Sequence, residues 1–204
     1  MLKSKFIILI AVIFCFETQL VSQHQISKYE FCWAFFHPIA SIKIKRHLPK
    51  AMIVYHEVKS SKQLDTLESG GKLDAFRHTF TMAYLSHFVK VRKLRKLGKA
   101  HEKGNQYYFY RKKHEVEDGE RADSLACEMD LRNNELGFLI GTSNKDVKIE
   151  ELKEIVLSQI KLGNAWYLKK NAKNEYVSCK NEPINLNNYE NVWFVPKCLI
   201  RSNE

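Results

Sequence analysis

Apolar residues recur every three or four positions along most of the chain beyond residue 28, which is the period of amphipathic helices. This pattern predicts helices over residues 29–36, 39–58, 73–96, 123–141 and 146–162. Pro49 lies inside the second of these segments and predicts either a kink or a break into two helices. Gly98 is expected to interrupt the third helix before a further helical turn, and a charged connector follows over residues 111–120.

The periodicity changes after Gly163, a residue type that commonly ends helices. Residues 165–169 and 192–195 are interpreted as short strands around an Asn-rich loop. We therefore predict a mainly α fold, in which a single helical bundle-like domain over residues 23–163 carries a small irregular or β-hairpin C-terminal tail over residues 164–204.

The N-terminus has the pattern of a secretory signal. Lys3 and Lys5 precede an apolar run over residues 6–16, and a polar stretch follows. The run is shorter than the roughly 20 residues that cross a bilayer. We expect residues 1–22 to be a signal peptide cleaved near Ser22, with an uncleaved anchor as the alternative. The processed protein would be periplasmic or secreted and would have no transmembrane span.

The chain is basic, with a formal net charge of +10, which becomes +9 when residues 1–22 are removed. A basic surface favours anionic partners such as phospholipid, nucleic acid, acidic glycan or another envelope component, or it only keeps the protein soluble. Much of the excess lies in residues 90–103, which have no interleaved aromatic residues on which bases could stack. Nucleic acid binding is therefore weakly supported.

Four cysteines remain after the predicted processing. Cys179 and Cys198 lie in the loop-rich tail, and export would allow them to form a disulfide that contributes roughly 3 kcal/mol. Cys32 and Cys127 lie within helical patterns and are interpreted as small buried hydrophobic residues.

Polar residues form three stripes beside the apolar faces. Residues four positions apart share one side of a helix, and three pairs have this spacing: Asp74 with His78, His101 with Asn105, and Asp130 with Asn134. Gly137 and Gly141 continue the third line, where they would allow a backbone or a ligand to come close. Stripes of this kind can meet inside a helical bundle, where metal sites are often built.

The residue types in these stripes suit a divalent cation such as zinc, manganese or iron. The predicted metal ligands and catalytic residues are His78, His101, Glu102 and Asp130, and Glu102 could instead act as a base on metal-bound water. The residues predicted to bind substrate are Arg77, Asn105, Asn133 and Asn134. This set favours a metal-dependent hydrolase that acts on a phosphoester or another bond of an anionic substrate.

Two other interpretations remain open. The same residues could form a structural hydrogen-bond network in a non-enzymatic envelope protein, with Asp74 as a helix N-cap. Residues 90–103 could bind anionic lipid or glycan. The sequence has no Gly-rich phosphate loop, GxSxG elbow or CxxC pair, which argues against P-loop nucleotidases, serine hydrolases and thioredoxin-like proteins.

The order His78, His101 with Glu102, Asp130 is similar to the His … His-Asp … Asp pattern of HD-domain phosphohydrolases, which are also helical. This chain departs from that pattern, because Glu102 stands where those enzymes have aspartate. The likeness therefore implies metal binding but does not imply that the chain is an HD-domain phosphohydrolase.

The segments KLDAFRH, KLGKAHEKGNQ and EMDLRNNELGFLIG together resemble a bacterial domain family without an established reaction, found in short exported proteins and at the ends of RHS-type polymorphic toxins. The resemblance covers residues 71–141. The motif positions that it implies are Asp74, Arg77, His78, His101, Glu102, Asn105, Glu128, Asp130, Asn133, Asn134 and Gly137. The association with toxins implies an enzyme acting on a cell-envelope or nucleic-acid polymer.

Overall fold

The computed structural model describes residues 26–111 and 121–204. The predicted signal peptide lies outside these residues, as does the predicted connector beyond Arg111. The helices of the described parts are α2 (Lys28–Phe36), α3 (Pro38–Ser61), α4 (Lys72–Ser86), α5 (Val91–Tyr110), α6 (Ser124–Ser143) and α7 (Ile149–Lys161). The tail contains strands β1 (Trp166–Leu168) and β2 (Leu199–Arg201) and a 3-10 helix, η1 (Leu186–Tyr189).

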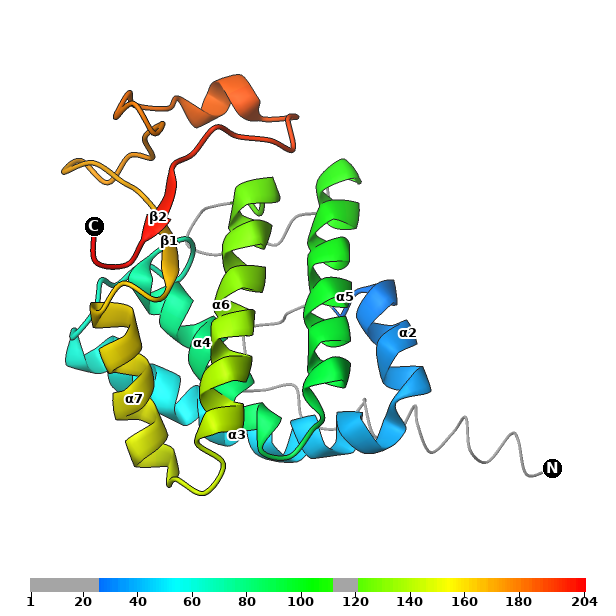
Figure 1. The fold of residues 1–204 in the computed structure, drawn as a ribbon. Helices are drawn as coiled ribbons and strands as arrows, with labels where there is room; N and C mark the ends of the chain where they lie inside the picture. Colours follow the sequence, from blue (N-terminus) through cyan, green and yellow to red (C-terminus); the bar gives the residue numbers. More distant parts are fainter. Residues whose placement is uncertain (1–25, 112–120) are drawn as a thin grey trace.

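The helices α4, α5, α6 and α7 stand roughly side by side, α3 runs across one end of them, and the tail lies over the opposite end (Figure 1). The main core lies between α3, α4, α6 and α7, and its largest fully buried side chains include Phe76, Phe80, Leu152 and Ile160. The prediction of a mainly α fold with a small hairpin tail is confirmed. Among the described helices, none is both long enough and apolar enough to cross a membrane.

Two glycines of α6 allow α4 and α6 to pack backbone against backbone. A Cβ atom on Gly137 would collide with the carbonyl oxygen of Thr79, and one on Gly141 would collide with that of Ala83. Gly137 and Gly141 were predicted to let a backbone or a ligand come close, and the backbone that does so is that of α4. This close approach sets the distance between polar side chains on the two helices.

Short side chains fix where the helices begin. Ser27 and Glu30 form a reciprocal capping box at the start of α2, and Asp123 caps α6 through the amides of Leu125 and Ala126. Asp65 accepts hydrogen bonds from the amides of Lys72 and Leu73 at the start of α4. Asp74 is therefore not the N-cap of α4, and its carboxylate instead accepts hydrogen bonds from Gly70 and Arg77.

Two predicted boundaries are wrong, and one of the two alternatives predicted at Pro49 is excluded. The predicted helix over residues 73–96 is two helices, with a reversal after Ser86 that contains neither glycine nor proline. Gly98 does not interrupt α5, which continues through it. It packs against Asn134 on α6, and a Cβ atom at position 98 would lie 3.1 Å from the side-chain nitrogen of Asn134. A break at Pro49 is also absent. The helix α3 continues through this proline, and beyond it Val54, Val58 and their neighbours pack into the core.

The tail is fastened to the helices by backbone pairing. β1 and β2 are antiparallel, with Trp166 opposite Arg201. The second strand was predicted over residues 192–195, but the partner of β1 is β2, a few residues later. A disulfide joins Cys179 to Cys198, which confirms the predicted pairing.

Candidate metal centre

Three side chains from two helices converge beside the α4–α6 contact. Asp74 and His78 lie one turn apart on α4, and Asp130 lies on α6. One ligand atom from each lies within 4.8 Å of the other two. His78 Nε2 is 3.3 Å from Asp130 Oδ1 and 3.5 Å from Asp74 Oδ1. All three side chains are mostly buried, so the group can surround a cation rather than sit on a solvated surface.

Asn134 orients the imidazole of His78. The Nδ1 atom of His78 lies 3.3 Å from Asn134 Oδ1. Because a carboxamide oxygen only accepts, this contact places the proton on Nδ1 and leaves Nε2 as the atom that faces the two aspartates. Histidine ligands of metals are commonly held this way, with the second ring nitrogen bonded to an oxygen.

Asp74 is positioned by its own helix turn. Arg77 donates to Asp74 Oδ1 through Nη2 at 2.7 Å and through Nε at 3.1 Å, and the amide of Gly70 donates to Oδ2 at 2.8 Å. These contacts fix the orientation of the carboxylate. They also place the guanidinium of Arg77, which is partly exposed, beside the cluster.

Glu102 lies next to this cluster but not within it. It is buried, its Oε2 accepts a hydrogen bond from Asn105 at 3.0 Å, and its charge interacts with that of Asp74. Burial raises the pKa of Glu102, while the charge of His101 and hydrogen bonds from Cys127 and Asn105 act in the opposite direction. A carboxyl group with a raised pKa can carry a proton at neutral pH. Of the two cysteines predicted to be buried, Cys127 is buried, whereas Cys32 is exposed, so the prediction for Cys32 is wrong.

His101 points to α2 instead of the cluster. Its Nδ1 lies 3.0 Å from Oε1 of Glu30, the residue whose other oxygen completes the α2 capping box. Burial lowers the pKa of His101, but the Glu30 hydrogen bond and the charges of Glu102 and Glu30 outweigh this effect and raise it to about 9. The predicted ligand pair of His78 and His101 is thus not brought together, because adjacent residues such as His101 and Glu102 face different neighbours of α5.

Three further predicted residues, Asn133, Glu128 and Asn105, do not belong to the cluster. Asn133 is fully buried, and its amide group pairs with both the N–H and the C=O of Trp166 at 2.9 Å. It anchors β1 to α6 and does not face the cluster. Glu128 forms an ion pair with Arg132 on the exposed side of α6. Asn105 contacts Glu102, so it can act on the cluster only through that residue.

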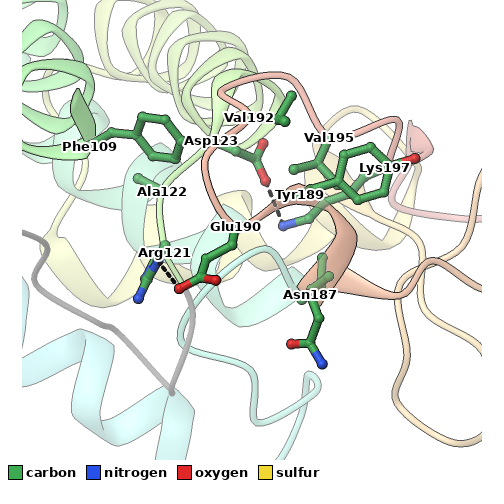
Figure 2. A pocket seen from close by; sticks show the side chains of 11 residues that line it. Phe109, Arg121, Ala122, Asp123, Asn187, Tyr189, Glu190, Val192, Val195 and Lys197 are labelled. Atoms are coloured by element: carbon green, nitrogen blue, oxygen red, sulfur yellow. Dashed lines mark ion pairs between the residues drawn. The ribbon is translucent and has the colours of Figure 1, made fainter. Parts of the chain in front are cut away.

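A cavity of about 310 Å³ lies where the ends of α5 and α6 meet the tail. Figure 2 shows the side chains that line it, including two ion pairs, Asp123 with Lys197 at 2.7 Å and Arg121 with Glu190 at 3.8 Å. Because these pairs neutralise the charged side chains of its wall, the cavity offers no net charge to a ligand. The cluster of Asp74, His78 and Asp130 therefore remains the stronger candidate site.

The fold and this cluster define a mainly helical protein with a candidate metal centre. Residues 31–164 match the family model described as a domain of unknown function, DUF6973, and the chain belongs to that family. The matched range contains every residue of the cluster. No curated protein and no solved structure matches the chain. The prediction of a domain family without an established reaction is confirmed, while the toxin association and the likeness to HD-domain phosphohydrolases stay predictions.

Proposed function

We propose that the protein is an exported metal-dependent hydrolase that cleaves a phosphoester or another bond of an anionic substrate. The observation that carries this proposal is the convergence of one imidazole nitrogen and two carboxylate oxygens from Asp74, His78 and Asp130 within 4.8 Å. Mixed nitrogen and oxygen ligands suit manganese, iron or zinc. Such a cation would supply Lewis acidity and lower the pKa of a bound water.

Arg77 and Glu102 supply the chemistry around the ligands. The guanidinium of Arg77 is anchored to Asp74, so an anionic group of the substrate that approaches the cation would also meet a fixed positive charge. Glu102, with its raised pKa, is suited to donate a proton to the leaving group. This role differs from the base that the sequence suggested, because burial favours the neutral acid.

A structural network is the rival function, and one observation favours it. The His78–Asn134 contact and the His78–Asp130 contact both join α4 to α6. The same side chains can therefore hold the two helices together without any catalysis. In that case the residues matter for stability alone.

Metal binding is tested by thermal melting of protein purified without chelator. Manganese or zinc at about 100 times its Kd should stabilise the wild type by roughly 2.7 kcal/mol. Asp130→Asn should remove this gain. Glu135→Gln is the matched control, because Glu135 lies on the exposed side of α6 and pairs with Arg95. Absence of bound metal in the wild type, together with no gain in melting temperature, would exclude the metal centre.

Hydrolysis is tested separately with bis-p-nitrophenyl phosphate as a generic phosphodiester. Glu102→Gln should keep the metal-dependent gain in melting temperature. It should lower kcat by about a hundredfold on a dinucleotide, whose alkoxide leaving group needs a proton, and far less on the p-nitrophenyl ester, whose leaving group does not. His78→Ala should abolish both the metal-dependent gain in melting temperature and the hydrolysis. If the wild type binds metal but cleaves neither this ester nor a panel of anionic glycans, the hydrolase fails and the metal centre stands. Loss of stability in His78→Ala without any effect of metal supports the structural network.

A further inference from the structure

Large apolar side chains are exposed at the corner where α2 meets α3. The side chain of Phe36 is 71% exposed and that of Ile39 is 70% exposed. Three further residues on either side of this corner are about half exposed, namely Phe31, Phe35 and Ile42. We call these five residues the corner patch. A patch of this kind usually marks a surface that meets a partner or a membrane.

The corner patch belongs to a rigid part of the fold. Trp33 and Ala40 lie on the opposite sides of the same helices and are buried in a core cluster with Leu85, Val89 and Leu94. The indole nitrogen of Trp33 donates to the carbonyl of Lys93 at 3.0 Å. The exposed residues therefore cannot turn inward without breaking this packing.

Apart from Glu30, which is paired with His101, the charged residues next to the corner patch along α2, α3 and the α4–α5 turn are cations. Residues 31–56 contain no aspartate or glutamate, and their cations are Lys43, Lys45, Arg46 and Lys50. The turn from α4 to α5 lies alongside, since Lys43 donates to the carbonyl of Phe88 at 3.0 Å. That turn adds exposed Lys90 and Arg92, and residues 75–101 also contain no acidic residue.

We propose that the corner patch docks on the surface of an anionic phospholipid bilayer. Aromatic and aliphatic side chains framed by lysine and arginine are the composition of helices that lie in the interface of a membrane. Cations at the membrane surface are attracted by anionic headgroups. A protein partner fits less well, because the cores of protein–protein interfaces are depleted in lysine. The apolar side chains would enter the headgroup region while the cations contact lipid phosphates.

The proposal is tested by co-sedimentation of the full chain with vesicles of equal parts phosphatidylglycerol and phosphatidylcholine. Phe36→Glu combined with Ile39→Glu should weaken binding at least tenfold. Lys45→Glu combined with Arg46→Glu should weaken binding to these vesicles several-fold and leave binding to pure phosphatidylcholine vesicles unchanged. Leu139→Glu is the control, because Leu139 is equally exposed on α6, away from the corner patch.

All of these substitutions lie on exposed positions, and equal melting temperatures will show that each variant is folded. If both double variants bind as the wild type does, the apolar run of residues 6–16 holds the protein on vesicles and the proposal is wrong. It is also wrong if the wild type fails to sediment, or if Leu139→Glu weakens binding as much as the patch variants. One further outcome is that the wild type self-associates but does not bind vesicles, and that Phe36→Glu combined with Ile39→Glu abolishes the self-association. The corner patch would then bind a second copy of the chain.

Discussion

Two groups of histidine and carboxylate lie on either side of the buried Glu102, and they differ in arrangement. At the α4–α6 contact, His78 faces two aspartates and is oriented by Asn134. At the α2–α5 contact, His101 pairs with the carboxylate of Glu30. The first arrangement gathers three ligand atoms around one point, whereas the second joins His101 to a carboxylate that also completes a helix cap.

The difference shows that spacing alone does not make a metal site. Both histidines belong to polar pairs four residues apart, and both lie close to carboxylates. Glycines bring a neighbouring helix close to both sites, because Gly137 and Gly141 lie against α4 and Gly104 lies against Ser27 at the start of α2. The supply of ligands decides which histidine can hold a cation, because His78 has Asp74 one turn away on α4 and Asp130 on α6, whereas the residue one turn from His101 is Asn105.

The largest effect is expected from Gly137→Leu, which pushes α6 away from α4. The new side chain would collide with the backbone of Thr79 and Ala83, and the protein should lose about 3 kcal/mol in the free energy of unfolding. If it still folds, stabilisation by manganese or zinc should disappear, while the His101–Glu30 pair survives. Chemical denaturation with and without metal measures both the loss of stability and the loss of stabilisation by metal. Retention of metal binding in a folded Gly137→Leu variant would contradict the importance of the close approach.

A second prediction separates the neighbours Asn133 and Asn134. Asn134→Ala should weaken metal binding about tenfold, because His78 loses the oxygen that orients it. Asn133→Ala should instead cost about 2 kcal/mol of stability, since the backbone of Trp166 loses both hydrogen bonds. Metal titration and denaturation of both variants provide the test. Equal effects on metal affinity would mean that Asn134 does not orient the ligand.

The smallest effect concerns pH. The folded-state pKa of His101 is about 9, above its ordinary value of 6.5. Its contribution to stability is therefore fully present below pH 6.5 and is lost as the pH rises through 9. His101→Gln should remove this part of the pH dependence and leave metal binding unchanged. Melting curves from pH 6 to 10 compare it with the wild type. Unchanged pH dependence would show that the Glu30 contact does not raise the pKa.

Parts of the site could be predicted from the sequence because a helix fixes which residues share a side. The spacing of Asp74 with His78, and of Asp130 with Asn134, placed each pair correctly on one helix face. Asp74 was not among the predicted metal ligands, and a role as helix cap was left open because it lies near the start of α4. Nothing local indicated that Asp65 would bind those amides instead. Glu30 lies about 70 residues before His101, and no pattern in the sequence connects them.

By itself the sequence determined the helices, their apolar faces and the stripes of polar residues, because these depend on periodicities within a few turns. It also indicated that Gly137 and Gly141 would allow close contact. Only the tertiary structure decided that α4 rather than α5 is the neighbour of those glycines, that the chain reverses after Ser86, and that β1 pairs with residues 199–201. These outcomes depend on packing between distant segments, which local spacing does not encode.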